Sequence, residues 1–241
     1  MSENQVTKRF MLKFSKQGKL RWISHLDTVR TLQKAIRRAE IPIAYSQGFN
    51  PHPKLSIAIP LALGYLSQGE YLDLELAEDM LGSEVQARLN DVLPEGLTIL
   101  GNRELSLKVP SLMSLAQVSE YQIRVPAYEE TVWSSAMQNL WNMETLLLQK
   151  ENKKRQQIEV DLRPGLLAME MSSGINEDEF VTFRIMLETS SSLFVRIQDI
   201  IDLLCAHGNL PWVSAITVQA ERIEIGSTSQ GTYYSLADYP F

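Results

Sequence analysis

A group of basic side chains near the start of the chain is the first candidate for a binding site. Four Lys and Arg residues between positions 30 and 38 follow one another at spacings of four, three and one, so they project to the same side of a helix. Such a surface can neutralise several phosphates of a nucleic acid and release their counterions. Few acidic residues accompany these bases, whereas an ordinary solvated helix face, the alternative interpretation, usually carries intrahelical ion pairs. We predict a phosphate-binding surface formed by Lys19, Arg21, Arg30, Lys34, Arg37 and Arg38.

The loop at residues 46–54, with the sequence SQGFNPHPK, is the second candidate. Its glycine permits backbone conformations that are closed to other residues, and its two prolines reduce the entropy lost on binding. The rings of Phe49 and His52 offer flat faces on which a base could stack. A stiff connection with Phe49 packed inside is the alternative. We predict RNA contacts from Ser46, Gly48, Phe49, Asn50, His52 and Lys54.

A second basic run lies in the other half of the chain, before a predicted strand. It would extend the phosphate-binding surface, although a solvated hairpin is an equally good interpretation because such runs are common on surfaces. Its candidate RNA-binding residues are Lys153, Lys154, Arg155 and Arg163.

Two histidines are the candidates for catalysis. His25 would begin the first helix, where the positive end of the helix dipole favours a neutral imidazole that can act as a base. With His52 it could form an acid–base pair that attacks an RNA 2′-hydroxyl. Nothing in the sequence places the two rings together, so a His25 that caps or packs the helix is the preferred interpretation. We assign no catalytic residue and expect a protein that is not an enzyme, with the question of activity left open.

The cysteine content restricts cofactor chemistry. Cys205 is the one cysteine of the chain, whereas an iron–sulfur cluster usually needs three or four thiolates. The three histidines are scattered, which disfavours a structural zinc site, and no common phosphate-loop or hydrolase motif occurs. We expect no metal and no cofactor.

Charge is distributed unevenly along the 241 residues. The whole chain has a net charge of −6, but residues 1–60 hold eleven Lys and Arg against three Asp and Glu, a balance of +8. A basic segment in an acidic protein favours a localised site for a polyanion. No stretch is apolar enough to span a bilayer, the first residues lack a secretory signal, and one cysteine allows no internal disulfide. We therefore expect a cytoplasmic protein without membrane contact.

The strands and helices that would position these residues can be predicted along the first half of the chain. Strands are predicted at 9–15, 71–77 and 97–105, and the apolar ends of the segment at 41–64 also resemble strands. One helix begins after Ser24, an N-cap with Asp27 three residues on, and stops at Pro42; the other covers 83–93. The buried stripe of the first helix is predicted to be Leu26, Val29, Leu32, Ile36 and Ala39.

The second half repeats this architecture. Strands are predicted at 119–127, 155–163, 166–172, 180–188 and 212–225, with 155–163 pairing with 166–172, and helices at 129–148 and 193–206. The β-α-β-β-α-β order predicts an α+β protein made of two tandem ferredoxin-like (βαββαβ) units with antiparallel sheets. The units would span residues 1–110 and 119–225, and a tail at 226–241 would be loose or docked through its aromatic residues.

The segments SHLD at 24–27 and SQGFNPHPK at 46–54 closely resemble the radical SAM-linked protein family of bacteria, and VDLRP at 160–164 fits it less distinctively. In that family the domain stands alone or follows a cobalamin-binding radical SAM domain. A C-x-x-x-C-x-x-C cluster motif does not occur here, so the chain looks like the stand-alone form. The same string is more distantly similar to the CRISPR repeat-processing endoribonucleases, which are also tandem ferredoxin-like proteins, but their glycine-rich loop near the C-terminus is not evident here. Neither resemblance carries over a catalytic residue.

The resemblance and the basic surface together imply an RNA-binding accessory protein that presents tRNA or rRNA to a separate radical SAM modification enzyme, cobalamin-dependent as in the fused members of the family. Two alternatives stay open. One is a metal-independent endoribonuclease that uses His25 or His52, and the other is a structural subunit that binds only its radical SAM partner. If RNA binding is correct, replacing Arg30, Lys34 and Arg37 together should weaken it and flatten its salt dependence.

Overall fold

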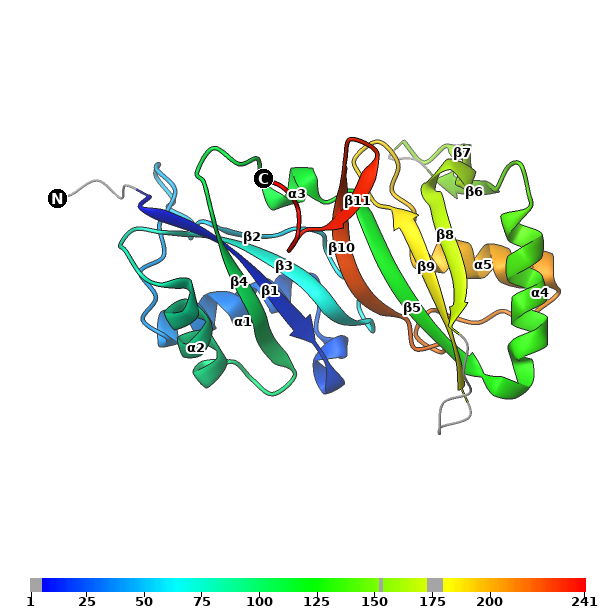
Figure 1. The fold of residues 1–241 in the computed structure, drawn as a ribbon, viewed down its shortest axis with the longest axis horizontal. Helices are drawn as coiled ribbons and strands as arrows, with labels where there is room; N and C mark the ends of the chain where they lie inside the picture. The colour runs from blue at the N-terminus through cyan, green and yellow to red at the C-terminus, as the bar shows by residue number, and fades with distance from the viewer. Residues whose placement is uncertain (1–5, 152–153, 173–179) are drawn as a thin grey trace. The chain divides into compact units, whose positions relative to one another are not determined.

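The computed structural model describes residues 6–151, 154–172 and 180–241. The chain forms two compact units, the first made of Met1–Ala116 with Glu224–Phe241 and the second of Gln117–Ile223. Each unit combines an antiparallel sheet with helices in the ferredoxin-like order (Figure 1). This confirms the predicted α+β class with two ferredoxin-like units.

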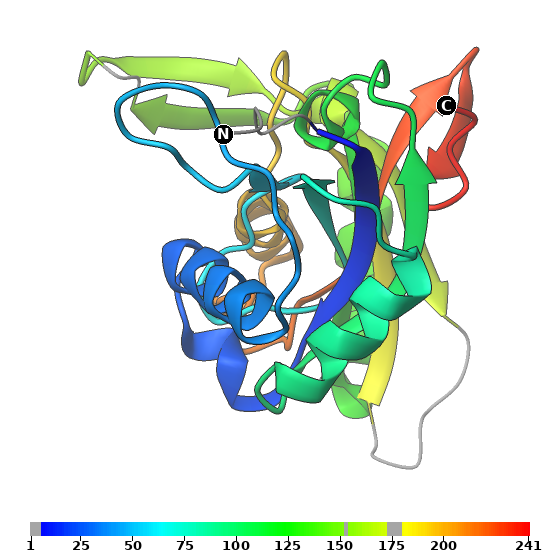
Figure 2. The ribbon, with the colours of Figure 1, turned by 90° about the vertical axis from the view of Figure 1, so that its left-hand side faces the viewer.

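The first unit contains the elements that carry the two main candidate regions. In chain order these are β1 (Lys8–Lys16), α1 (His25–Arg38), β2 (Leu55–Ile57), β3 (Leu66–Leu76), α2 (Gly82–Val92) and β4 (Leu97–Leu105). β1 pairs antiparallel with both β3 and β4, and the short β2 pairs with the second half of β3. The spatial order β4-β1-β3-β2 is that of a ferredoxin-like sheet, and α1 and α2 pack on one face of it (Figures 1 and 2).

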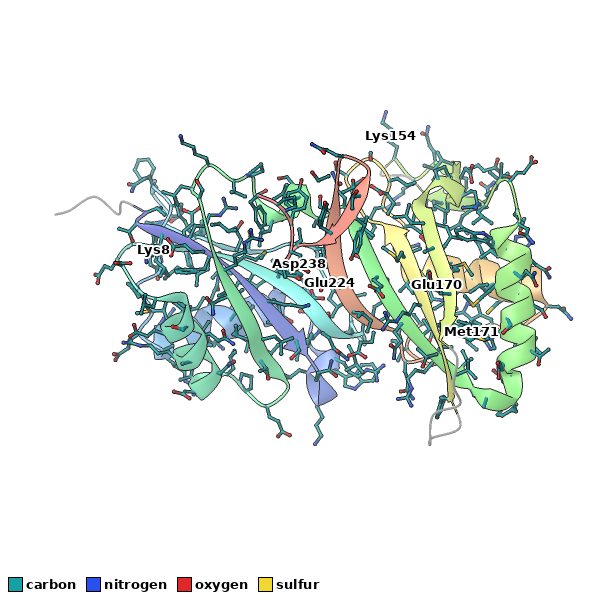
Figure 3. The ribbon with its side chains drawn as sticks, viewed as in Figure 1. Lys8, Lys154, Glu170, Met171, Glu224 and Asp238 are labelled. Carbon is teal, nitrogen blue, oxygen red and sulfur yellow. The ribbon has the colours of Figure 1, made fainter. Side chains whose placement is uncertain are left out.

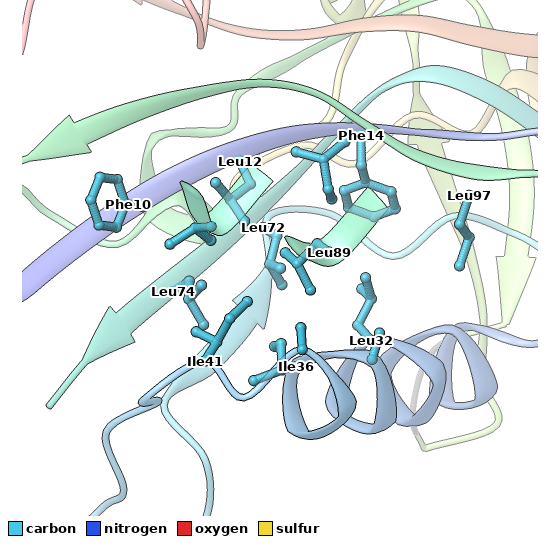
Figure 4. Close-up of a cluster of buried hydrophobic side chains, with 14 of the residues drawn as sticks. Phe10, Leu12, Phe14, Leu32, Ile36, Ile41, Leu72, Leu74, Leu89 and Leu97 are labelled. Carbon is cyan, nitrogen blue, oxygen red and sulfur yellow. The ribbon is translucent and has the colours of Figure 1, made fainter. Parts of the chain in front are cut away.

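The sheet of the first unit has two buried faces because successive strand residues point to opposite sides. In β1, Phe10, Leu12 and Phe14 face the helices and join Leu32 of α1 in one apolar cluster (Figure 4). Met11 lies in a second cluster on the opposite face. Full burial of a large apolar side chain contributes roughly 1.5–3 kcal/mol, so the first cluster fixes α1 firmly to the sheet.

The end of the chain completes the first unit. β10 (Glu221–Ser229) begins in the second unit and ends in the first, where β11 (Thr232–Ser235) pairs with it. Leu236 is fully buried in the cluster that contains Met11, together with α3 (Leu112–Leu115). The sequence assigned residues 226–241 to a separate tail, whereas the structure places everything from Glu224 onward in the first unit, because this segment covers an apolar face of the sheet.

Glu224 of β10, which is labelled in Figure 3, holds this segment to the sheet. The Tyr71 hydroxyl donates to Oε1 at 2.6 Å and Lys13 Nζ donates to Oε2 at 2.6 Å. Burial beside this carboxylate raises the pKa of Tyr71 well above its ordinary value. Lys13 is therefore committed to the fold and does not contribute a free positive charge.

The second unit contains β5 (Val118–Pro126), α4 (Glu130–Trp141), β6 (Leu147–Glu151), β7 (Gln157–Asp161), β8 (Leu166–Ser172), β9 (Phe180–Glu188) and α5 (Ile197–Gly208). Its sheet has the order β5-β9-β8, with antiparallel pairing throughout. α4 and α5 bury Trp133 and Leu140 from the first helix and Ile200 and Leu204 from the second.

Three predictions for the second unit were wrong in detail. The helix predicted at 129–148 ends at Trp141. Leu147 begins β6, and the Asp161 carboxylate accepts the Leu146 N–H at 2.8 Å just before that strand. β7 pairs with β6 as a separate two-stranded sheet, while β8 pairs with β9, so the predicted partner of β7 is incorrect. The last strand begins at Glu221 and not at Trp212, because the backbone turns between Ala215 and Gln219.

Asp199 provides a test of the second unit's stability. Its side chain is 1% exposed and accepts hydrogen bonds from Lys150 at 2.7 Å and Arg196 at 2.6 Å. Burial raises the pKa of this carboxyl, but hydrogen bonds from Arg196 and Lys150 outweigh it and leave the pKa below its ordinary value. The folded state therefore stabilises the ionised form, and this contribution is present above the ordinary carboxyl pKa of about 4 and is lost as the pH falls through the lowered value.

We expect Asp199→Asn to lower the free energy of unfolding of the second unit by about 1–3 kcal/mol at pH 7. The difference from the wild type should shrink as the pH falls below about 4. Urea unfolding at several pH values measures it, and Asp91→Asn, at an exposed carboxylate in α2, is the control with little expected effect. A loss that stayed constant down to pH 2 would show that the charge of Asp199 is not what stabilises this site.

Candidate nucleic-acid interface

α1 begins where its N-cap predicts. The Ser24 hydroxyl accepts the Asp27 N–H at 3.1 Å and donates to the Asp27 carboxylate at 2.7 Å. The hydrogen bond from Ser24, and to a lesser degree the Arg30 guanidinium, lowers the pKa of Asp27. The helix ends at Arg38, and Glu40, with a φ of 53°, turns the chain back toward the sheet. The N-terminus of α1 thus carries a fixed negative charge, and the positive charges lie along the rest of the helix.

Four basic residues occupy the outer face of α1. Successive residues are rotated by about 100° in a helix, so Arg30, Lys34, Arg37 and Arg38 fall within a sector of about 100°, opposite the buried stripe. All four side chains are exposed, and Arg30 pairs with Asp27 at 3.2 Å. Lys34, Arg37 and Arg38 make no side-chain hydrogen bond or ion pair with any residue that the structure describes. The predicted surface therefore gathers on one side of the helix with three of its cations unpaired.

The buried stripe of α1 is shorter than predicted. Leu32, Ile36 and Ala39 are buried and Val29 is partly buried, but Leu26 is 64% exposed. Leu26 lies six residues before Leu32, a rotation of about 240°, so it points away from the core. The prediction for Leu26 was wrong because its spacing from Leu32 does not match the helical repeat.

The basic residues before α1 are used mainly within the fold. Lys16 is buried and its Nζ donates to the Ile23 carbonyl at 2.9 Å. Arg21 donates to the Gly64 carbonyl at 2.7 Å and lies over the ring of Trp22 at 5.1 Å. Lys19, by contrast, is exposed on the short 3-10 helix Gly18–Trp22. Of the two predicted contacts from this segment, Lys19 is the better placed to meet a phosphate.

The loop at 46–54 is closed at its base and open at its tip. The Ser46 N–H donates to the His52 carbonyl at 2.8 Å, and the His52 N–H donates to the Ser46 hydroxyl at 3.0 Å. Gly48 adopts a φ of 132°, a conformation that glycine favours. Phe49 and Asn50 are exposed, with Phe49 at 106%, so the alternative in which Phe49 packs inside is wrong. In Figure 2 this light-blue loop extends beyond the helices.

A cavity of about 520 Å³ lies between the second half of α1 and this loop. Gln33 and Arg37 line it from the helix, and Tyr45, Pro51 and Pro53 line it from the loop and its base. Arg37 thus belongs both to the outer face of α1 and to the cavity.

A second cavity, of about 460 Å³, lies on the strand side of the loop and is lined by His52 and by charged residues that the fold already pairs. Arg9 donates to Asp73 at 2.8 and 2.7 Å, and Lys54 donates to Glu75 at 2.8 Å. Lys54, a predicted RNA contact, is therefore partly committed to a carboxylate. This cavity offers a ligand few unsatisfied groups.

The second basic run lies in the second unit. Lys154 is exposed at the turn between β6 and β7 (Figure 3), and Arg155 is exposed with a φ of 60°. Arg163 lies over the ring of Trp141 at 4.6 Å, and its guanidinium donates to three backbone carbonyls at 3.1, 3.1 and 3.3 Å. Lys153 lies outside the described residues. Arg163 is thus committed to holding the local backbone, in place of the predicted phosphate contact.

The two histidines lie on different elements and are not hydrogen-bonded to each other. His25 is the first residue of α1, whereas His52 lies in the loop at 46–54. The imidazole of His52 makes no hydrogen bond with His25 or with any other residue that the structure describes. Among the described residues, no group of three His, Cys, Asp or Glu side chains could hold a metal ion.

Sequence reasoning missed two residues of this region, Gln33 and Tyr45. Gln33 lies one turn before Arg37 and was passed over because it carries no charge. Tyr45 belongs to a segment predicted as strand-like, and only the return of the chain to α1 places it beside the helix. Pro42 and Pro53 stand at the two ends of this segment. Because proline is confined to the edges and irregular parts of sheets, they were the available signal that the segment is a shaped loop and not a regular strand.

Comparisons with known proteins give a family but no activity. In the part of the chain that the structure describes, no helix has the length and apolar character needed to cross a bilayer. No curated protein sequence matches the chain. A chain in a crystal structure of a Cbf5-Nop10-Gar1 complex is similar over 90% of this chain and 49% of its own length, with 11% identity and a TM-score of 0.46, so this chain spans about half of it.

A second solved structure, of a protein assigned as a glycine cleavage system transcriptional repressor, matches 95% of this chain and 98% of its own, with 11% identity and a TM-score of 0.22. Neither score supports an argument about the site. A family model described as "Uncharacterized protein conserved in bacteria (DUF2344)" matches residues 9–196, well over half of the sequence. The chain therefore belongs to the DUF2344 family of bacterial proteins.

Proposed function

We propose that this protein binds RNA through the outer face of α1 and the loop at 46–54, and that it presents the RNA to a separate radical SAM modification enzyme. The observation that carries the proposal is the set of three exposed cations, Lys34, Arg37 and Arg38, which lack partners among the described residues. The RNA would be a tRNA or an rRNA. The radical SAM enzyme would be cobalamin-dependent, as in the fused members of the resembling family.

Several other surface cations of the chain are paired with carboxylates, whereas three neighbouring cations on α1 are not. Lys8, Arg88 and Arg184 lie within 2.6–3.2 Å of a carboxylate, as does Arg196. A solvated helix face usually carries such pairs, and α1 does so only at its first turn, between Asp27 and Arg30. In a protein of net charge −6, like charges gathered on one helix face favour a polyanion as ligand.

Phe49 favours RNA with unpaired bases over a uniform duplex. A fully exposed aromatic ring costs hydration free energy unless something covers it, and the closed base of the loop fixes the two ends of the segment that carries this ring. Sequence-specific RNA recognition commonly stacks unpaired bases on aromatic side chains. The α1 face would then contact the phosphate backbone, and Phe49 would contact a base.

The radical SAM partner is supported by the resemblance and by the cysteine content. One cysteine, Cys205, cannot supply the thiolates of an iron–sulfur cluster, so the cluster would belong to the partner. Capture of the tagged chain from its own cells should retain a protein that contains iron and sulfide, and retention should survive ribonuclease treatment. Capture of RNA without any iron–sulfur protein would contradict this half of the proposal and leave the RNA-binding half standing.

The RNA-binding half is tested by titration. Purified protein is mixed with a hairpin RNA that carries a single-stranded loop, and binding is followed by fluorescence anisotropy at several salt concentrations. The logarithm of the association constant should fall linearly with the logarithm of salt concentration, with a slope of about −0.7 to −0.9 for each phosphate contacted. Absence of binding at low salt would reject the proposal.

Phe49→Ala should weaken binding to the same hairpin by about 5- to 100-fold, because stacking on an aromatic ring contributes about 1–3 kcal/mol per base. The slope against salt should stay as in the wild type, since no charge is lost. Tyr128→Ala, at an aromatic residue of the second unit that is 85% exposed, is the matched control and should bind normally. Equal losses in the two variants would indicate a general surface effect in place of stacking by Phe49.

A further inference from the structure

The cavity between α1 and the loop combines apolar walls with polar groups that have no protein partner among the described residues. Its walls include Ile36, Ile41 and three proline rings, and its volume of about 520 Å³ falls within the range of about 300–1,000 Å³ found for small-molecule sites. Such a cavity is large enough for one nucleotide but far too narrow for a helix of RNA.

Three polar groups at this cavity have no partner among the described residues. They are the Gln33 amide, the Arg37 guanidinium and the Tyr45 hydroxyl. Tyr45 is 37% exposed, so its ring forms part of an open wall. The charged groups of the neighbouring cavity are instead paired with one another, as Arg9 is with Asp73 and Lys54 with Glu75. The contrast indicates that the cavity beside α1 is the one suited to a ligand.

We propose that this cavity binds a single unpaired base from the RNA that contacts α1. This inference rests on the proposed function. The side-chain amide of Gln33 can donate and accept at once, which matches the neighbouring donor and acceptor on the open edge of an unpaired base. The Tyr45 ring and the rings of Pro51 and Pro53 supply flat apolar faces for the base.

Arg37 joins the cavity to the outer face of the helix. Because it lines the cavity and also lies on the same side of α1 as Lys34 and Arg38, it can contact the phosphate of the inserted nucleotide. The flanking phosphates of the RNA would then lie over the other basic side chains on the outer face of α1. The site therefore takes a bulged or looped-out nucleotide, since a base held in a duplex cannot leave its stack without losing its pairing.

The test uses two RNA hairpins that differ at one position. The first carries a single bulged adenosine, and the second carries an abasic residue at the same bulge, so backbone shape and charge are matched. Wild-type protein should bind the adenosine hairpin about 5- to 100-fold more tightly. Tyr45→Ala and Gln33→Ala should abolish that preference and bind the abasic hairpin as the wild type does. Tyr128→Ala is the control that should keep the preference.

Each result has one meaning. Equal, salt-dependent binding of the two hairpins by the wild type overturns this inference while the proposed function stands. Equal weakening of binding to both hairpins in Tyr45→Ala and Gln33→Ala, with the preference for adenosine unchanged, also overturns it. No binding of either hairpin by the wild type rejects the inference and the proposed function together. Binding of free adenosine monophosphate that Tyr45→Ala abolishes, without a preference for the bulge, would assign the cavity to a free nucleotide and overturn the inference.

Discussion

Replacing Arg30, Lys34 and Arg38 together with glutamine is expected to weaken RNA binding by about 100-fold at 0.1 M salt. Each residue lies exposed on the outer face of α1, and each would release counterions from one phosphate. The slope of the logarithm of affinity against the logarithm of salt concentration should become shallower by about 2 to 3 units, because three phosphate contacts are removed. Arg37 is kept in place because it also lines the cavity beside the loop.

A control variant with the same change in net charge separates local contacts from general attraction. Lys8→Gln, Lys108→Gln and Arg184→Gln remove three positive charges from exposed or half-exposed positions outside α1. Two of these residues pair with carboxylates on the surface, and such pairs contribute little to stability, so the control should fold normally. If both triple variants lost affinity and slope equally, the net charge of the protein and not the face of α1 would govern binding.

The periodicity of the sequence predicted most elements of the first unit. The Ser24 cap of α1 and the alternation in β3 depend on residues close in the chain; α1 began where predicted, and β3 formed but starts at Leu66, five residues before the predicted start. The second unit was harder because α4 and β6 are separated by only a few residues, and Leu147 continues the apolar pattern of the helix into a strand. The segment just before β6 is held by a distant side chain, Asp161, whose carboxylate accepts the Leu146 N–H, and no local pattern reveals this contact.

The candidate site was predictable where it depends on one helix and not where it depends on long-range contacts. The spacing of Arg30, Lys34, Arg37 and Arg38 placed them on one face correctly, since helical rotation is a local property. Lys16 looks equally basic in the sequence, yet its charge is used on the Ile23 carbonyl inside the fold. The role of each cation was decided by the carbonyls and carboxylates that the tertiary structure brings to it. A count of positive residues therefore overestimated the surface.

The buried pair of Arg9 and Asp73 should be among the largest single contributions to the stability of the first unit. Arg9 is 5% exposed and Asp73 is 7% exposed. The guanidinium donates to both carboxylate oxygens, at 2.8 and 2.7 Å, and its other N–H groups donate to the carbonyls of Val109 and Pro110. Asp73 also accepts the Leu112 N–H at 3.3 Å, so the pair fastens the segment before and within α3 to the sheet.

We expect Asp73→Ala to lower the free energy of unfolding of the first unit by about 3–5 kcal/mol, because it leaves the Arg9 guanidinium buried without its counter-charge. The double variant Arg9→Met, Asp73→Leu should be more stable than Asp73→Ala, since it removes the unpaired charge along with its partner. Asp79→Ala, which removes an exposed carboxylate beside Lys8, is the control and should cost less than about 1 kcal/mol. Urea unfolding of the four proteins measures these differences. A loss below about 1 kcal/mol in Asp73→Ala would mean that the two carbonyls alone compensate the Arg9 charge, and the carboxylate would then serve mainly to hold α3.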